Sequence, residues 1–248
     1  MLDTFQILGY SGGIPTQSRG TTCLMVSTSK FDLMLDCGEG SYLRWNKAGY
    51  KWKNLQYIII THMHPDHTGG LVPLLFYRKI YGIKSPLTII GPPNLKDYLS
   101  DSFRHTGFEY IEKFYSINIA GNSSIDLGDE INLTGMEMKH VIPCWGYALN
   151  DNNKKIVFIT DTLFNNNSIE LATKADVLIH ESTYKNRDID EAQKHFHTTE
   201  IQAMEIADKA QVDRLILTHF SQRLSDEDVQ EWRWKGQACV VFDERQKI

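Results

Sequence analysis

The stretch Thr61-His-Met-His-Pro-Asp-His-Thr-Gly-Gly70 decides how the rest of this sequence is interpreted. It places three histidines and one aspartate within six residues, directly after the apolar run Tyr57-Ile-Ile-Ile60, which is typical of a buried strand. His62 and His64 are two residues apart, so on an extended chain their rings point to one side and can bind one metal ion together.

The second half of the stretch predicts a bend. Pro65 disfavours a helical conformation at the residue before it, and Gly69-Gly70 allows a tight approach before an apolar helical segment over 71–81. Asp66 and His67 can therefore face a second metal ion. A histidine-rich surface loop is the alternative interpretation, but metal-ligand residues at this density favour a metal site.

Composition and charge limit the class of protein. The chain has 248 residues, of which 42% are hydrophobic and 23% charged, with no linker or low-complexity tract, so we expect one globular domain over residues 1–248. The net charge of −5 offers no basic field to a nucleic acid, so RNA binding would need a local patch. Four scattered cysteines without a Cys-x-x-Cys pair indicate reduced thiols in a cytoplasmic protein. The absence of a signal sequence or a long apolar run predicts no membrane segment.

Hydrophobic patterning predicts alternating strands and helices. Strands are expected over residues 5–9, 21–28, 31–36, 57–61, 87–91, 114–119, 131–139, 155–159, 176–180, 214–218 and 237–243. Helices are expected over residues 41–49, 71–81, 94–102, 169–173 and 198–209.

More ligand-type residues stand just beyond these predicted strands. Three strands lead to His140, Asp161 and His219. With the opening cluster they make seven nitrogen and oxygen ligands, enough for two ions that share a bridging carboxylate: His62, His64, Asp66, His67, His140, Asp161 and His219. Asp36 ends another strand, where it can orient a metal ligand or serve a turn.

This set, with its Thr-His-x-His-x-Asp-His core, resembles the metallo-β-lactamase superfamily over essentially the whole chain. Further motifs are similar to those of its ribonuclease Z branch: Asp36-Cys-Gly-Glu-Gly40, His140-Val-Ile-Pro-Cys-Trp-Gly-Tyr147, Asp161-Thr162, Val177-Leu-Ile-His-Glu-Ser-Thr-Tyr184, His197-Thr-Thr199 and Leu217-Thr-His-Phe-Ser221. The resemblance implies an α/β protein with a four-layer αββα sandwich, a site along one edge of it, and a homodimer.

The resemblance also implies roles for the ligand-type residues. One zinc ion would be held by His62, His64 and His140, the other by Asp66, His67 and His219, and Asp161 would bridge them. Zinc suits mixed imidazole and carboxylate ligands, and Mn²⁺ or Fe²⁺ remains open from the ligand types alone.

A proton donor is implied as well. His197 and Glu181 match a pair that supplies a proton in the resembling family, and a carboxylate bonded to one ring nitrogen suits a general acid. The alternative is that His197 only hydrogen-bonds to backbone at a helix start. His195, two residues away, is the other candidate for the proton donor. Asp66 would also accept a hydrogen bond from the attacking hydroxide and aim it.

The predicted reaction is in-line hydrolysis of a phosphodiester by a metal-bridging hydroxide. Ribonuclease Z proteins carry a long tRNA-binding arm between the positions of His140 and Asp161, where this chain has only enough residues for a hairpin, and Thr160 replaces the usual glycine. These departures favour a small or cyclic nucleotide-type phosphodiester as substrate. The alternatives are a tRNA 3′-processing endoribonuclease acting on RNA, and a metallohydrolase of sulfate or carboxylic esters. The pocket walls are expected from the loops 10–19, 103–114 and 184–195.

Overall fold

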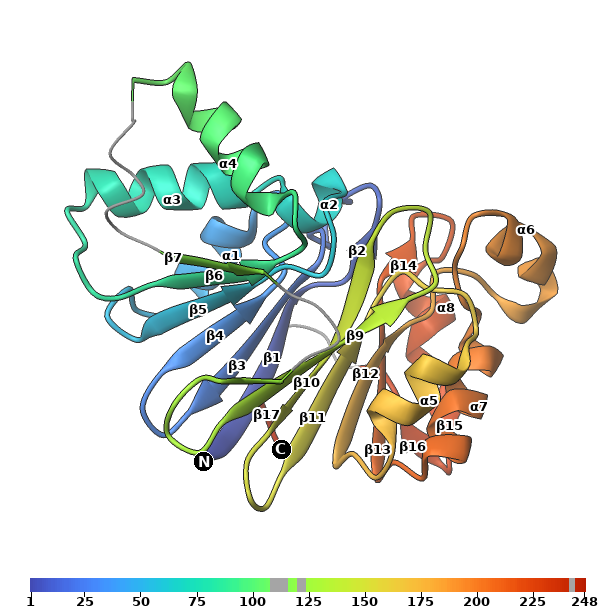
Figure 1. Ribbon diagram of the computed structural model, residues 1–248. Helices are drawn as coiled ribbons and strands as arrows, with labels where there is room; N and C mark the ends of the chain where they lie inside the picture. Colours follow the sequence, from blue (N-terminus) through green and yellow to red (C-terminus); the bar gives the residue numbers. More distant parts are fainter. Residues whose placement is uncertain (108–115, 120–123, 241–243) are drawn as a thin grey trace.

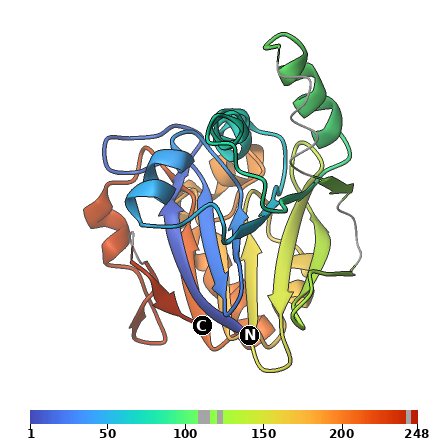
Figure 2. The same cartoon turned by 90° about the vertical axis from the view of Figure 1, so that its left-hand side faces the viewer.

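Two β-sheets lie face to face in the computed structural model, and helices cover their outer sides (Figure 1). The structure describes residues 1–107, 116–119, 124–240 and 244–248. Figure 2, turned by 90°, shows the chain ends together at one end of the strands. This is the αββα arrangement that the resemblance implies.

The first sheet has seven strands in the order β17-β1-β3-β4-β5-β6-β7. Their bounds are Gln246–Lys247 (β17), Leu2–Gly9 (β1), Cys23–Thr28 (β3), Asp32–Leu35 (β4), Leu55–Ile59 (β5), Thr88–Gly91 (β6) and Ser116–Ile119 (β7). Strands β4 to β7 are parallel, whereas β3 pairs antiparallel with both β1 and β4. The predicted strands over 21–28 and 31–36 therefore form a hairpin through Ser29-Lys30.

The second sheet has six strands in the order β13-β12-β11-β10-β9-β8. Their bounds are Arg214–Thr218 (β13), Val177–Glu181 (β12), Lys155–Ile159 (β11), Cys144–Asn150 (β10), Asn132–Met138 (β9) and Ser124–Asp126 (β8). Strands β11, β12 and β13 are parallel, so the residues that follow them emerge at the same edge. The interval between His140 and Asp161 holds β10 and its hairpin turn to β11, as predicted.

Two small sheets complete the strand pairing. β2 (Ser11–Gly12) pairs in parallel with β14 (Phe220–Ser221), and β15 (Arg233–Trp234) pairs with β16 (Gln237–Ala238). Because β2 follows a strand of the first sheet and β14 follows one of the second, their pairing joins the two halves beside the site. The predicted strand over 237–243 is wrong at residues 239–240, which form no strand, and residues 241–243 lie outside the described residues.

The helices lie on the outer faces of the sheets. The first sheet is covered by α1 (Ser41–Lys47), α3 (Leu71–Ile80) and α4 (Leu95–Arg104), and the second by α5 (Asn166–Ala172) and α7 (Glu200–Ala210). The short helical segments are α2 (Pro65–Thr68), η2 (Asn186–Asp188), α6 (Ile189–Lys194) and α8 (Asp226–Gln230). In the described part of the chain, no helix has both the length and the apolar character to cross a membrane.

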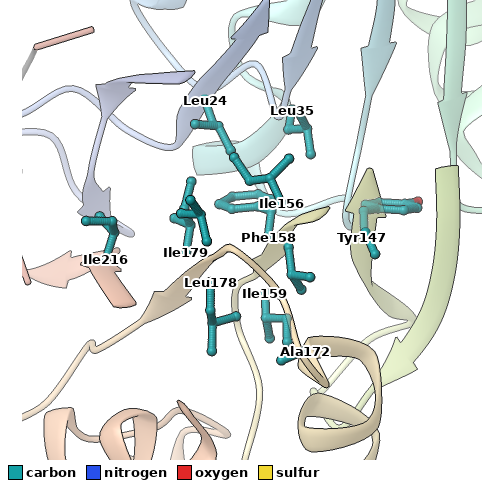
Figure 3. Close-up of a cluster of buried hydrophobic side chains, with 14 of the residues drawn as sticks. Leu24, Leu35, Tyr147, Ile156, Phe158, Ile159, Ala172, Leu178, Ile179 and Ile216 are labelled. Atoms are coloured by element: carbon teal, nitrogen blue, oxygen red, sulfur yellow. The ribbon is translucent and has the colours of Figure 1, made fainter. Parts of the chain in front are cut away.

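The main core fills the space between the sheets because alternate residues of each strand point to opposite faces. Leu24 of β3 lies beside Ile156 and Phe158 of β11, while Ile159 and Leu178 point the other way, toward Ala172 of α5 (Figure 3). Strands that are buried on both faces are apolar throughout, so continuous apolar runs in the sequence predict them. This rigid double layer fixes the strand ends that carry the site.

Candidate metal centre

Three histidines from both halves of the fold converge at the strand ends. His62 and His64 follow β5, and His140 follows β9 of the facing sheet. The Nδ1 atom of His64 lies 3.0 Å from His62 Nε2 and 3.3 Å from His140 Nε2. His64 is extended (φ −65°, ψ 148°) before Pro65, as predicted, and this backbone turns its ring toward the other two.

A second group of three residues lies next to the first. Asp66 and His67 are held in the single turn of α2, which begins at Pro65, and His219 follows β13. The Nε2 atoms of His67 and His219 are 3.3 Å apart, and each lies 3.3 Å from Asp66 Oδ2. The sequence predicted a bend here, and the structure has a short helix that begins at Pro65. Proline is common at the first position of a helix.

Asp161 lies between the two groups. Its Oδ1 is 3.2 Å from His67 Nε2 and 3.1 Å from His219 Nε2, whereas its Oδ2 is 3.7 Å from His62 Nε2 and 3.8 Å from His140 Nε2. Each oxygen therefore faces a different group, which is the position of a bridging carboxylate.

The spacing of the ligand atoms fits bound metal. In a tetrahedral site with zinc–nitrogen or zinc–oxygen bonds of about 2.0–2.1 Å, two ligand atoms lie about 3.3 Å apart. The measured 3.0–3.3 Å separations within each group are close to that value. The donors are imidazole nitrogens and carboxylate oxygens without a thiolate, a set that suits zinc and also manganese or iron.

Hydrogen bonds orient the histidine rings toward the centre. Asp36 Oδ2 lies 2.7 Å from His67 Nδ1, and Asp36 Oδ1 accepts a bond from the backbone N–H of Thr61. Of the two roles that the sequence left open for Asp36, the structure supports the orientation of a candidate ligand. Asp36 also fixes the end of β5. Such outer contacts select the ring tautomer whose Nε2 faces the metal.

Other ring nitrogens are held in the same way. Thr183 Oγ1 lies 2.9 Å from His219 Nδ1, and the carbonyl of Phe196 lies 3.3 Å from His140 Nδ1. The buried thiol of Cys144 lies 3.7 Å from His62 Nδ1. Its sequence neighbourhood gave no signal for this contact.

Strained backbone places several of these side chains. Asp36 (φ 57°), Asp161 (φ 48°) and His219 (φ 59°) are left-handed although none is glycine, and each directly or closely follows a strand. Such conformations cost of order 1–3 kcal/mol each and persist where surrounding contacts enforce them. Thr160 is one such contact for Asp161, because its hydroxyl donates to Asp161 Oδ1 at 2.5 Å.

His197 and Glu181 form a buried pair beside the two groups. Glu181 ends β12 and is inaccessible to solvent, and its Oε1 lies 3.1 Å from His197 Nδ1. The same Oε1 accepts a bond from the backbone N–H of Thr162 at 2.7 Å, which fixes the carboxylate. His197 precedes α7, whose capping box at Thr199 anchors this segment.

Charge favours the protonated form of His197. Burial opposes that form, but the adjacent Glu181 carboxylate outweighs burial and raises the pKa of His197 to about 9. For Glu181, burial acts to raise the pKa, and the neighbouring His197 overcomes this and lowers it. His197 also lies within 4.8 Å of ligand atoms on Asp161 and His219, so the distances alone permit it to bind metal as well.

His195, the competing histidine, lies at the rim instead. Its ring is half-exposed and pairs with Glu191 on its own helix, 3.3 Å away. His180 is buried next to Glu181. Its Nδ1 contacts the Glu181 carbonyl and its Nε2 has no hydrogen-bond partner among the described residues, so no described hydrogen bond joins it to a candidate ligand.

A cavity of about 320 Å³ opens onto the candidate ligands. Its other walls come from the loop after β2, the loop after β14 and the segment after β12: Gly12, Gly13, Ile14, Thr183, Tyr184, Ser221, Gln222 and Arg223. Two of the three predicted wall loops contribute, whereas residues 103–107 do not line it and residues 108–114 lie outside the described residues.

The chain is similar to a protein-family model, to ribonucleases and to solved structures with the same fold. The model of the family "Anti-Pycsar protein Apyc1" matches residues 4–238. A ribonuclease Z of Prochlorococcus marinus is 30% identical over 87% of each chain. The short form of human tRNase Z (ELAC1) superposes with a TM-score of 0.80 at 26% identity, covering 89% of this chain and 93% of the human one. The Bacillus subtilis metallo-β-lactamase fold protein YhfI has a TM-score of 0.85 over the whole of both chains at 18% identity, which supports the fold alone.

Proposed function

We propose, from its membership of the Apyc1 family of ribonuclease Z-like proteins with the metallo-β-lactamase fold, that this chain binds two zinc ions and hydrolyses a small, cyclic nucleotide-type phosphodiester. The relatives and the ligand groups support the broader class, a metal-dependent phosphodiester hydrolase. The observation that carries the reaction is the buried His197–Glu181 pair beside two convergent groups of ligand atoms.

The two groups would hold one ion each. His62, His64 and His140 supply three nitrogens to the first, Asp66, His67 and His219 supply three atoms to the second, and Asp161 offers one oxygen to both. Bound zinc lowers the pKa of water toward neutrality and neutralises charge on the phosphate oxygens.

The chain's own residues manage the protons. Glu181 binds Nδ1 of His197, so Nε2 is left to donate a proton to the departing oxygen, a step typically contributing about 10²–10⁴-fold. The backbone N–H of Gly13 donates to Asp66 Oδ2 at 2.8 Å, which holds Asp66 where it can accept a hydrogen bond from the attacking water.

The size of the cavity and the net charge of the protein support a small substrate. The cavity of about 320 Å³ is at the lower end of small-molecule sites. The short β10–β11 hairpin leaves no arm between His140 and Asp161, and the alignment with the Prochlorococcus protein extends over 272 positions, so that relative carries residues which this chain lacks. A net charge of −5 adds no general attraction for RNA.

The test compares three substrates on purified, zinc-loaded protein: bis(p-nitrophenyl) phosphate, adenosine 3′,5′-cyclic monophosphate and a tRNA precursor. His64→Ala should abolish turnover, whereas His105→Ala, at an exposed histidine outside the site, should leave it unchanged. Discrete 3′ cleavage of the precursor would instead support the tRNA-processing activity suggested by the ribonuclease Z relatives. Chromogenic sulfate and carboxylic esters are assayed beside these substrates, and hydrolysis of such esters alone would contradict phosphodiester chemistry for this chain.

We further propose a cytoplasmic homodimer. All four cysteines are free and buried, as expected in a reducing compartment. Leu43 of α1, Ile80 of α3 and the adjacent Tyr81 are 60–70% exposed, and exposed apolar side chains of this size are common at interfaces. Size-exclusion chromatography with light scattering would measure the mass, and a monomer at micromolar concentration would contradict this assignment.

A further inference from the structure

The rim of the cavity is apolar and aromatic, unlike its floor. Ile14 and Val141 line it with more than half of their side-chain surface exposed, and Tyr184 and His195 line it as well. We call these four residues the rim. A floor of charged and imidazole groups suits a phosphate, but it gives no reason for aliphatic and aromatic side chains around the opening.

Tyr184 is the central residue of the rim. Its ring lies parallel to that of His195, with an interplanar angle of 7° and ring centroids 6.4 Å apart. The centroid of the Tyr184 ring is also 6.0 Å from that of His197, the proposed proton donor. A substrate group attached to the departing oxygen would therefore lie close to Tyr184.

The position of Tyr184 is fixed by its backbone. It forms a β-bridge with Thr199, the residue that caps α7, so the ring is presented from an anchored segment. Burial raises the pKa of the Tyr184 hydroxyl, with Arg223 acting in the opposite direction. Arg223, which is exposed, lines the same cavity and adds positive charge near an anionic ligand.

Resting on the function proposed above, we propose that the rim binds the nucleobase of the substrate, with Tyr184 as the surface on which the base stacks. Every nucleobase has a π-face, so stacking tolerates purines and pyrimidines alike. The site would then recognise a cyclic nucleotide by its phosphate on the floor and its base on the rim, with little discrimination among bases.

The test measures binding separately from turnover. In the His197→Ala background, which slows hydrolysis and keeps the seven proposed ligands, equilibrium dialysis gives the Kd of adenosine 3′,5′-cyclic monophosphate and of ribose 3′,5′-cyclic phosphate, which has no base. Tyr184→Ala should raise the Kd of the nucleotide roughly 5- to 100-fold and leave that of the base-free compound unchanged.

Matched variants separate stacking from structural damage. Tyr184→Phe keeps the ring and should bind both compounds as the parent does. His105→Ala, at an exposed histidine that does not line the cavity, should change neither Kd. Equal losses for the two compounds in Tyr184→Ala, or no loss for either, would overturn the base site. A selective loss in a protein whose wild type hydrolyses no phosphodiester would keep the base site and refute the proposed function instead.

Discussion

Replacing Glu181 with glutamine tests the assignment of His197 as the proton donor. The substitution removes one negative charge 3.1 Å from His197 Nδ1 and keeps the size of the side chain and an oxygen for the backbone N–H of Thr162. A variant of this kind changes the charge at His197 more than the shape of the site.

The expected shift follows from the two opposing influences on His197. Glu181 raises its pKa to about 9 from the usual 6.5, although burial acts to lower it, and this rise corresponds to about 3 kcal/mol in favour of the protonated form. Without the carboxylate, burial remains and the smaller effects of Asp161 and Asp66 oppose it, so the pKa should fall from about 9 toward the usual 6.5.

The role of His197 as a general acid determines how the substitution changes the pH dependence of the rate. A general acid must be protonated, so activity is retained below its pKa and lost as the pH rises through it. Lowering that pKa therefore moves the alkaline limb of the profile to lower pH. At pH 8 the protonated fraction would fall about 30-fold, while at pH 6 it would change less than about twofold.

The assay is the pH dependence of kcat/KM between pH 5.5 and 9.5, with adenosine 3′,5′-cyclic monophosphate as an alkyl ester and bis(p-nitrophenyl) phosphate as an aryl ester. The loss should appear with the alkyl ester and be small with the aryl ester, because a nitrophenolate leaves without protonation. Bound zinc is measured in parallel, and Glu191→Gln, which removes the exposed partner of His195, serves as the matched control. A Glu181→Gln profile that overlays the wild type would refute the assignment, and loss of zinc from His197→Ala would make His197 a ligand instead.

Three further predictions address the support of the site and the core. Gly12→Ala should sharply reduce zinc content and activity while the protein stays folded, because the added Cβ would lie 2.8 Å from the ring of His219; zinc analysis and circular dichroism decide this. Asp36→Asn should weaken zinc binding about 10- to 100-fold through the lost partner of His67, as measured by chelator competition. Leu178→Ala, in the fully buried core, should lower the free energy of unfolding by about 2–5 kcal/mol in denaturant titration without altering zinc stoichiometry.

The sequence was informative where one local pattern sufficed. Continuous apolar runs marked the central strands of both sheets, because those strands are buried on both faces. The strand predicted over 237–243 is wrong at residues 239–240. Apolar residues continue there past β16, and Cys239 is buried and hydrogen-bonds through its backbone to Leu217 and Trp232, but it is not in a strand.

Roles within the site depended on distant partners. Sequence could not separate His195 from His197 on spacing; the structure turns His195 toward Glu191 in its own helix and His197 toward Glu181 on β12. The sequence allowed Asp36 to orient a metal ligand, but only the structure identifies that ligand as His67, and no local pattern indicated the contact of Cys144 with His62.

The sequence by itself determined where the buried strands lie and which ligand-type residues follow them, because both are local patterns, and the resemblance of these motifs to a known superfamily implied the fold class. Tertiary structure alone decided which of those residues meet. His62 lies near His140, and His67 near His219, only because the two sheets pack face to face and the pairing of β2 with β14 joins them. That packing is a property of side-chain volumes across the whole core, which no short stretch of sequence contains.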